Sequence, residues 1–230
     1  MPLSRRKVLA GAGSALALGA VIGTRAFAAP ASAEKSVDPD AALQQLKEGN
    51  ERFAAGRSMH SDYSAKTAAG AGIRNPIAAI LSCSDARVPS EIIFDQAPGD
   101  LYVLRSAGNV LDQSVTAGLD YAVHFLKVPI ILVLGHTDCG VVTLATQLVR
   151  MRKELPQPLA GLIKSIETAV ITAHARHPRD MAAAAIEENI KLAVKRLGKD
   201  STILSEALAA SKVRAAGGLF DHATGKVTFL

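Results

Sequence analysis

The sequence predicts an α/β protein in which a mainly parallel sheet is covered by helices. Three short, continuous apolar runs, IAAILSC (77–83), LYVLRSA (101–107) and VPIILVLGH (128–136), are each bounded by Pro, Gly or Asp. Such runs suit strands that are buried on both faces, as in a parallel sheet between helices. The residues 114–128 carry apolar side chains at helical spacing. This alternation of strand and helix is the βαβ pattern.

The beginning of the chain has the layout of an export signal. The charged stretch Ser4–Lys7 precedes an Ala/Gly/Leu-rich run, Val8–Gly23, and SRRKVL resembles a twin-arginine signal. Small-residue triplets end at Ala28 and Ala33, so we expect cleavage after one of them. An uncleaved membrane anchor is disfavoured because the run is short and rich in glycine. We therefore expect a signal peptide in 1–33 and export to the periplasm, or another extracytoplasmic space, without a stable membrane span.

The remaining chain, residues 34–230, is expected to form one domain with little net charge. Four of the 26 basic residues lie in the first 33 residues, which contain no acid, so the other 22 nearly balance the 21 acidic residues. The chain also lacks clustered Lys and Arg with interleaved aromatic residues, which a nucleic-acid surface needs. A nucleic-acid partner is therefore not expected.

Helices are expected on both sides of the three apolar runs. Asp38 and Asp40 provide capping oxygens ahead of AALQQLKEGNERF (41–53), whose apolar residues recur near helical spacing. The stretch 55–75 has no clear period and predicts a loop with one short helix. Beyond the third run, the pattern predicts three helices, at 141–155, 162–177 and 179–197. A strand at 212–220, a turn at 223–225 and a short final segment at 226–230 are expected to follow.

The residues that carry chemistry follow two of the predicted strands. Cys83, Asp85 and Arg87 alternate along CSDAR where the first apolar run ends, and His136 and Cys139 occur in GHTDCG where the third ends. Ligands of open α/β sheets bind beyond the carboxyl ends of the strands. We therefore expect the two groups of residues to meet.

Two thiolates, an imidazole and a carboxylate form a ligand set that suits zinc. A structural zinc site usually contains paired CxxC motifs, whereas this set is divided between two strand ends and includes an aspartate that water can replace. The pattern therefore favours catalysis. The alternative is a disulfide between Cys83 and Cys139 in an exported scaffold, which leaves Asp85, Arg87 and His136 without a role. HxxC alone would be a weak signal.

The motifs of the chain resemble those of the β-class carbonic anhydrases. CSDARVPSEIIF, GDLYVLRSAGN, LDYAVHFLKV and GHTDCG occur in the order found in that family, and LKEGNERF and GGLFDHATGKV extend the resemblance to most of residues 41–230. The resemblance implies the β-carbonic anhydrase fold, with a late antiparallel strand, and a homodimer or a higher homo-oligomer with its active site near the subunit interface.

The resemblance also implies one Zn²⁺ per chain, held by Cys83, His136 and Cys139. The fourth position belongs to Asp85 or to water, and Arg87 pairs with Asp85 and draws it off the metal. The guanidinium fork matches a carboxylate bidentately, which agrees with this role. Zinc lowers the pKa of bound water to about 7, so hydroxide is available to attack carbon dioxide and form bicarbonate and a proton.

A substrate pocket can be assigned by the same resemblance. Arg74 stands where many members have glutamine, Tyr121 fits a tyrosine often found in the pocket, Tyr102 replaces a common phenylalanine and Ala107 a common valine. With Gly108, these residues are expected to form a pocket that is wider and more polar than usual. Arg74 either binds bicarbonate or faces solvent.

Other functions remain open at this point. Related zinc sites hydrolyse carbon disulfide or carbonyl sulfide, and a non-catalytic zinc- or bicarbonate-binding protein would keep part of the motif, although the Asp85 and Arg87 pair argues against the latter. The sequence indicates no proton shuttle. The other histidines are expected to be surface or packing residues: His60, His124, His174, His177 and His222.

Overall fold

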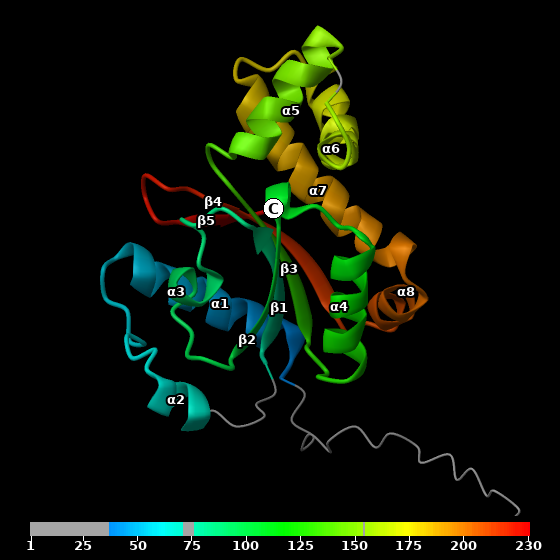
Figure 1. Cartoon of the computed structure of the whole chain (residues 1–230). Helices are drawn as coiled ribbons and strands as arrows, with labels where there is room; N and C mark the ends of the chain where they lie inside the picture. Colours follow the sequence, from blue (N-terminus) through cyan, green and yellow to red (C-terminus); the bar gives the residue numbers. More distant parts are fainter. Residues whose placement is uncertain (1–36, 71–75, 154) are drawn as a thin grey trace, which may run out of the picture. The chain divides into compact units, whose positions relative to one another are not determined.

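A five-stranded sheet forms the centre of the structure, a computed structural model that describes residues 37–70, 76–153 and 155–230 (Figure 1). The predicted signal peptide and Arg74 lie outside the described residues. The strand order is β2-β1-β3-β4-β5; the first four strands are parallel and β5 is antiparallel to β4. The strands are β1 (Ala78–Cys83), β2 (Leu101–Ser106), β3 (Ile130–His136), β4 (Arg214–Phe220) and β5 (Val227–Phe229). The predicted fold class is therefore confirmed.

Helices cover both faces of the sheet, as Figure 1 shows. Every residue of β1 and β3 is buried, which explains their continuous apolar runs. Side chains alternate between the faces of a strand, so Ile80 packs in one apolar core with Leu46 and Phe94, whereas Leu81 packs in the other with Leu119.

The helices match most of the predicted periods. They are α1 (Pro39–Ala54), α2 (Ala65–Gly70), α3 (Ser90–Ile93), α4 (Gln113–His124), α5 (Gly140–Met151), α6 (Leu159–His174), α7 (Met181–Asp200) and α8 (Thr202–Ala209), with a 3₁₀ turn η1 (Ala107–Asn109). Asp38 caps α1 by accepting from the backbone N–H groups of Asp40 and Ala41. Asp40, expected as a second cap, instead lies in the first turn and pairs with Arg214. None of the helices in the described ranges is long and apolar enough to cross a membrane.

Three differences from the prediction have local causes. Helix α5 ends at Met151 rather than at 155, because Arg152 adopts a left-handed conformation with φ 51°. Helices α3 and α8 were not predicted, since they are only 4 and 8 residues long and too short for a clear helical period.

Candidate metal centre

Two thiols and an imidazole meet at the carboxyl edge of the sheet. Strands β1 and β3 are parallel neighbours and end with Cys83 and His136, so both residues lie at the same edge of the sheet. Cys139 is the residue before α5. The ligand atoms of these three side chains lie within 4.8 Å of one another, and the residues are 3%, 0% and 2% exposed. The structure therefore brings together the predicted Cys/His/Cys set.

The arrangement fits a zinc ion. The two Sγ atoms are 4.0 Å apart, and two thiolates on a tetrahedral zinc at about 2.3 Å would be roughly 3.8 Å apart. The Nε2 atom of His136 is buried and has no hydrogen-bond partner among the described residues. A buried, unpaired ring nitrogen is costly unless it binds something. A disulfide is not formed, since both cysteines are free.

The two neighbouring thiols shift each other's pKa in opposite directions. The Cys139 thiol beside Cys83 lowers the pKa of Cys83, and the backbone N–H of Gly108, 3.4 Å from Cys83 Sγ, contributes in the same direction although burial opposes it. The nearby Cys83 sulfur raises the pKa of Cys139. One thiolate is therefore favoured without metal, and a cation is needed to hold both thiolates together.

Asp85 is held beside this group by the predicted partner. Arg87 donates from Nε to Asp85 Oδ1 at 3.0 Å and from Nη2 to Oδ2 at 2.8 Å. This fork holds the pKa of Asp85 far below its usual range. Asp85 Oδ2 lies 4.0 Å from His136 Nε2, so the carboxylate is adjacent to the metal-binding atoms but is engaged by Arg87.

Arg105 fixes the backbone of the same segment and was missed in the sequence. Its Nε donates to the carbonyl oxygen of Cys83 at 3.1 Å, and its Nη2 donates to that of Asp85. Arg105 is on β2, the strand that pairs with β1. Its only sequence signal is a charged residue inside the apolar run LYVLRSA.

His222 has a different position from the one expected from the sequence. It is not merely a surface or packing residue, because its Nε2 lies 3.0 Å from His136 Nδ1. It is also one of three residues, with Asp85 and His136, that could hold a metal ion. Spacing in the sequence could not reveal this contact, which depends on the register between β3 and β4.

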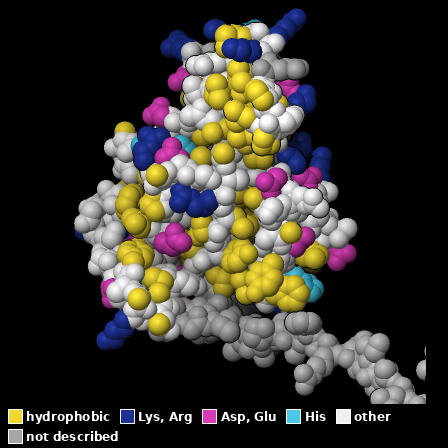
Figure 2. All heavy atoms as spheres, in the orientation of Figure 1, with side chains coloured by type: hydrophobic (Ala, Val, Ile, Leu, Met, Phe, Trp, Pro, Cys, Tyr) yellow, Lys and Arg dark blue, Asp and Glu magenta, His cyan; other side chains and the backbone are white. Residues whose placement is uncertain are grey.

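The predicted pocket residues are only partly brought to this centre. Gly108 contacts Cys83 through its backbone N–H, and Ala107 precedes it in η1. The rings of Tyr102 and Tyr121 lie 6.1 Å apart, and Tyr121 also lies against Phe125. Tyr121 and Phe125 are 45% and 46% exposed, and Figure 2 shows apolar side chains on the surface over α4. A pocket between these residues stays a prediction.

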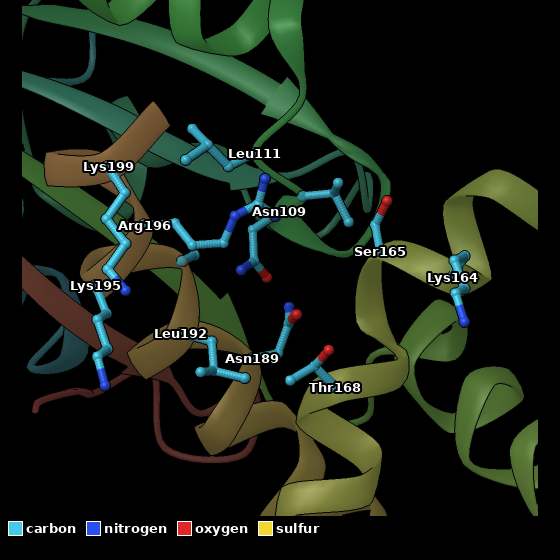
Figure 3. A pocket seen from close by; sticks show the side chains of 12 residues that line it. Asn109, Leu111, Lys164, Ser165, Thr168, Asn189, Leu192, Lys195, Arg196 and Lys199 are labelled. Atoms are coloured by element: carbon cyan, nitrogen blue, oxygen red, sulfur yellow. The ribbon is translucent and has the colours of Figure 1, made fainter. Parts of the chain in front are cut away.

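A cavity of about 400 Å³ lies behind the loop that follows β2 (Figure 3). Its lining includes Asn109 and Asn189 but none of the predicted metal ligands or pocket residues. Asn189 donates to the carbonyl oxygen of Gly108 at 2.8 Å, and the N–H of Gly108 faces Cys83. Asn189 therefore holds the backbone of Gly108, whose N–H contacts the Cys83 sulfur.

Known proteins share this fold and these motifs. The family model described as carbonic anhydrase matches residues 78–227. A carbonic anhydrase of Mycolicibacterium smegmatis is 35% identical over 83% of this chain and 92% of its own length. Carbonic anhydrase 2 of Mycobacterium tuberculosis is 50% identical over 48% of this chain, and that match spans about half, 54%, of the relative.

Solved structures agree with the sequence matches. The β-carbonic anhydrase CcaA has a TM-score of 0.62 and 26% identity over 81% of this chain and 94% of its own. The Coccomyxa β-carbonic anhydrase, solved in complex with acetazolamide, has a TM-score of 0.62 and 25% identity over 82% of this chain and 86% of its own. With the Cys/His/Cys group at the sheet edge and the match to the family model, this chain belongs to the β-carbonic anhydrase family.

Proposed function

We propose that the chain is a zinc-dependent carbonic anhydrase that interconverts carbon dioxide and bicarbonate. The observation that carries this proposal is the Arg87 fork on Asp85, next to three buried ligands. Three protein ligands with a fourth position left open are typical of catalytic zinc sites. A structural site would be closed by a fourth protein ligand.

Each residue of the centre has a distinct task in this reaction. Cys83, His136 and Cys139 would hold the zinc ion, which supplies a Lewis acid that lowers the pKa of bound water to about 7. Arg87 occupies both carboxylate oxygens of Asp85. The carboxylate keeps further lone pairs, so Asp85 can accept a hydrogen bond from a nearby water and orient it toward carbon dioxide.

The low pKa of Asp85 is consistent with that role. Because Arg87 stabilises the charged form, Asp85 remains an acceptor throughout the neutral range and does not compete with water for the proton. Arg105 holds the carbonyl groups of Cys83 and Asp85. The Asp85 carboxylate and the Cys83 sulfur are thereby kept at a fixed separation.

Removal and restoration of the metal tests the proposal. We expect the purified protein to contain one zinc per chain, to lose carbon dioxide hydration when the metal is chelated under reducing conditions, and to recover it with added Zn²⁺. Full activity in the metal-free protein would contradict the proposal. Stoichiometric zinc without hydration would instead favour carbon disulfide or carbonyl sulfide as substrate, or a non-catalytic binding role.

We further propose that the chain is exported by the twin-arginine route and acts as a homodimer or higher oligomer. The support for export is the SRRKVL motif and the apolar run that follows it. Folded export would allow zinc to bind in the reducing cytoplasm before the thiols could oxidise. Replacing Arg5 and Arg6 by lysine should retain the protein in the cytoplasm, while the matched change at Arg25 should not; unchanged export of the double variant would exclude this route.

A further inference from the structure

His222 lies beside the buried ring of His136, just after β4. Its Nε2 is 3.0 Å from His136 Nδ1, and the two rings meet at 67° with centroids 5.0 Å apart. The pairing of His136 with Phe220 in the β3–β4 ladder brings His222 here, although the two histidines are 86 residues apart.

The position of His222 is fixed by its own contacts. Its backbone N–H donates to Thr137 Oγ1 at 3.2 Å, and its ring meets the Phe220 ring at 82° with centroids 5.1 Å apart. The preceding residue, Asp221, accepts from the backbone of Ala223 and the hydroxyl of Thr224. These contacts fix the backbone at His222, and the Phe220 ring packs against its imidazole.

The chemistry of His136 requires an acceptor on this side. If Nε2, which has no partner among the described residues, gives its lone pair to zinc, the ring proton must be on Nδ1. The Nδ1 atom has two neighbours that can accept, the carbonyl oxygen of Thr137 at 2.8 Å and Nε2 of His222 at 3.0 Å. Acceptors of this kind set the tautomer and the ring orientation of metal-binding histidines.

A separate metal ion on Asp85, His136 and His222 explains the same contact less well. Both oxygens of Asp85 already accept from Arg87, and His136 also belongs to the group with the two cysteines. A metal there would share the Asp85 carboxylate with Arg87 and compete with the two cysteines for one imidazole. A hydrogen bond from His136 to His222 leaves the pairing of Asp85 with Arg87 unchanged.

We propose that His222 is a positioning residue for the metal centre: its Nε2 accepts the Nδ1–H of His136 and directs His136 Nε2 toward Cys83 and Cys139. This inference rests on the proposed zinc site. It adds a residue from the β4–β5 turn to a group of three ligands that come from β1, β3 and the residue before α5.

Zinc affinity measured by competition with a chelator tests this role. His222→Phe keeps a flat ring but removes the acceptor, and should weaken zinc binding about 10- to 100-fold. His222→Gln supplies an amide oxygen and should restore the affinity to within about threefold of the original protein. His174→Ala, at an exposed histidine on α6, should change nothing. Equal affinity in the Phe and Gln variants would overturn the proposal, provided their circular dichroism spectra match that of the original protein.

A second measurement needs no variant. Nitrogen-15 NMR of the zinc-loaded protein should show His136 protonated at Nδ1 and His222 protonated at Nδ1, with His222 Nε2 unprotonated. A proton on His222 Nε2 would overturn the proposal. If the original protein binds no zinc, the proposed function fails; if it binds zinc and hydrates carbon dioxide but the Phe variant binds zinc equally well, only the positioning role fails.

Discussion

Asp95 is the side chain that ties the loop after α1 to the core. It is fully buried and accepts hydrogen bonds from the backbone N–H groups of Met59 and His60 at 3.0 and 2.8 Å, and from Nε of Arg52. Burial alone would raise the pKa of Asp95, but these donors outweigh it and lower the value. The charged form is therefore the stabilising one.

Asp95→Asn should lower the free energy of unfolding by about 2–3 kcal/mol at pH 7, because an amide replaces a charged acceptor facing three donors. The folded-state pKa lies below the ordinary one, so this stabilisation is complete above about pH 4 and is lost as the pH falls through the folded-state pKa. Urea unfolding at pH 7 and pH 3 checks this, with the exposed Glu48→Gln as control. A difference between Asp95→Asn and the original protein that does not shrink at pH 3 would contradict it.

The residues of the metal centre illustrate what the sequence could predict. Cys83, Asp85 and Arg87 are local in the chain, and their closeness follows from their position at one strand end. His222 and Arg105 act through partners on neighbouring strands. Those contacts depend on strand order and register, which a single sequence does not specify.

Strand β3 and helix α7 approach each other closely behind the metal centre. A Cβ atom at Gly135 would lie 2.5 Å from Cδ1 and 2.6 Å from Cγ1 of Ile190, a buried residue of α7. Gly135 directly precedes His136. This contact therefore sets the spacing between the helix and the strand that carries a metal ligand.

Gly135→Ala should destabilise the protein by about 1–3 kcal/mol, because the added methyl overpacks a core that has no space for it. Gly198→Ala is the matched control: its Cβ would meet Leu208 at an ordinary 3.6 Å, and alanine favours the interior of α7 by up to about 1 kcal/mol. Urea unfolding of both variants measures the difference. A Gly135→Ala variant with the same free energy of unfolding as Gly198→Ala would show that the β3–α7 contact relaxes without cost.

At the level of elements, the apolar runs predicted β1, β2 and β3 closely. Burial on both faces leaves a continuous hydrophobic signal, and β1 and β3 are completely buried. The end of α5 was placed too late because Arg152 turns into the left-handed region, and arginine has no sequence signature for that conformation.

The described part of the chain presents exposed apolar side chains beside an edge strand of the sheet. Strand β2 is at one edge of the sheet, and the exposed rings of Tyr121 and Phe125 lie on or next to α4. Exposed edges and contiguous apolar patches are typical of interfaces. We expect this surface to join two copies of the chain.

Phe125→Asp should therefore shift the protein toward the monomer, because dimerisation would bury the new charge. Light scattering coupled to size-exclusion chromatography measures the mass. Ile171→Asp places the same charge on an exposed apolar residue of α6 and should leave the mass unchanged. A monomeric original protein, or a Phe125→Asp variant with an unchanged mass, would exclude this interface.

The measurement that tests the proposed function most directly is stopped-flow hydration of carbon dioxide between about pH 6 and 9. It compares the zinc-quantified mature protein with Asp85→Ala at equal zinc content. We predict a rate that rises with pH around an apparent pKa near 7 and falls about 100-fold or more in the variant, since Asp85 orients the attacking water. Equal rates in the two proteins, or no hydration at one zinc per chain, would contradict a carbonic anhydrase centred on the pair Asp85 and Arg87.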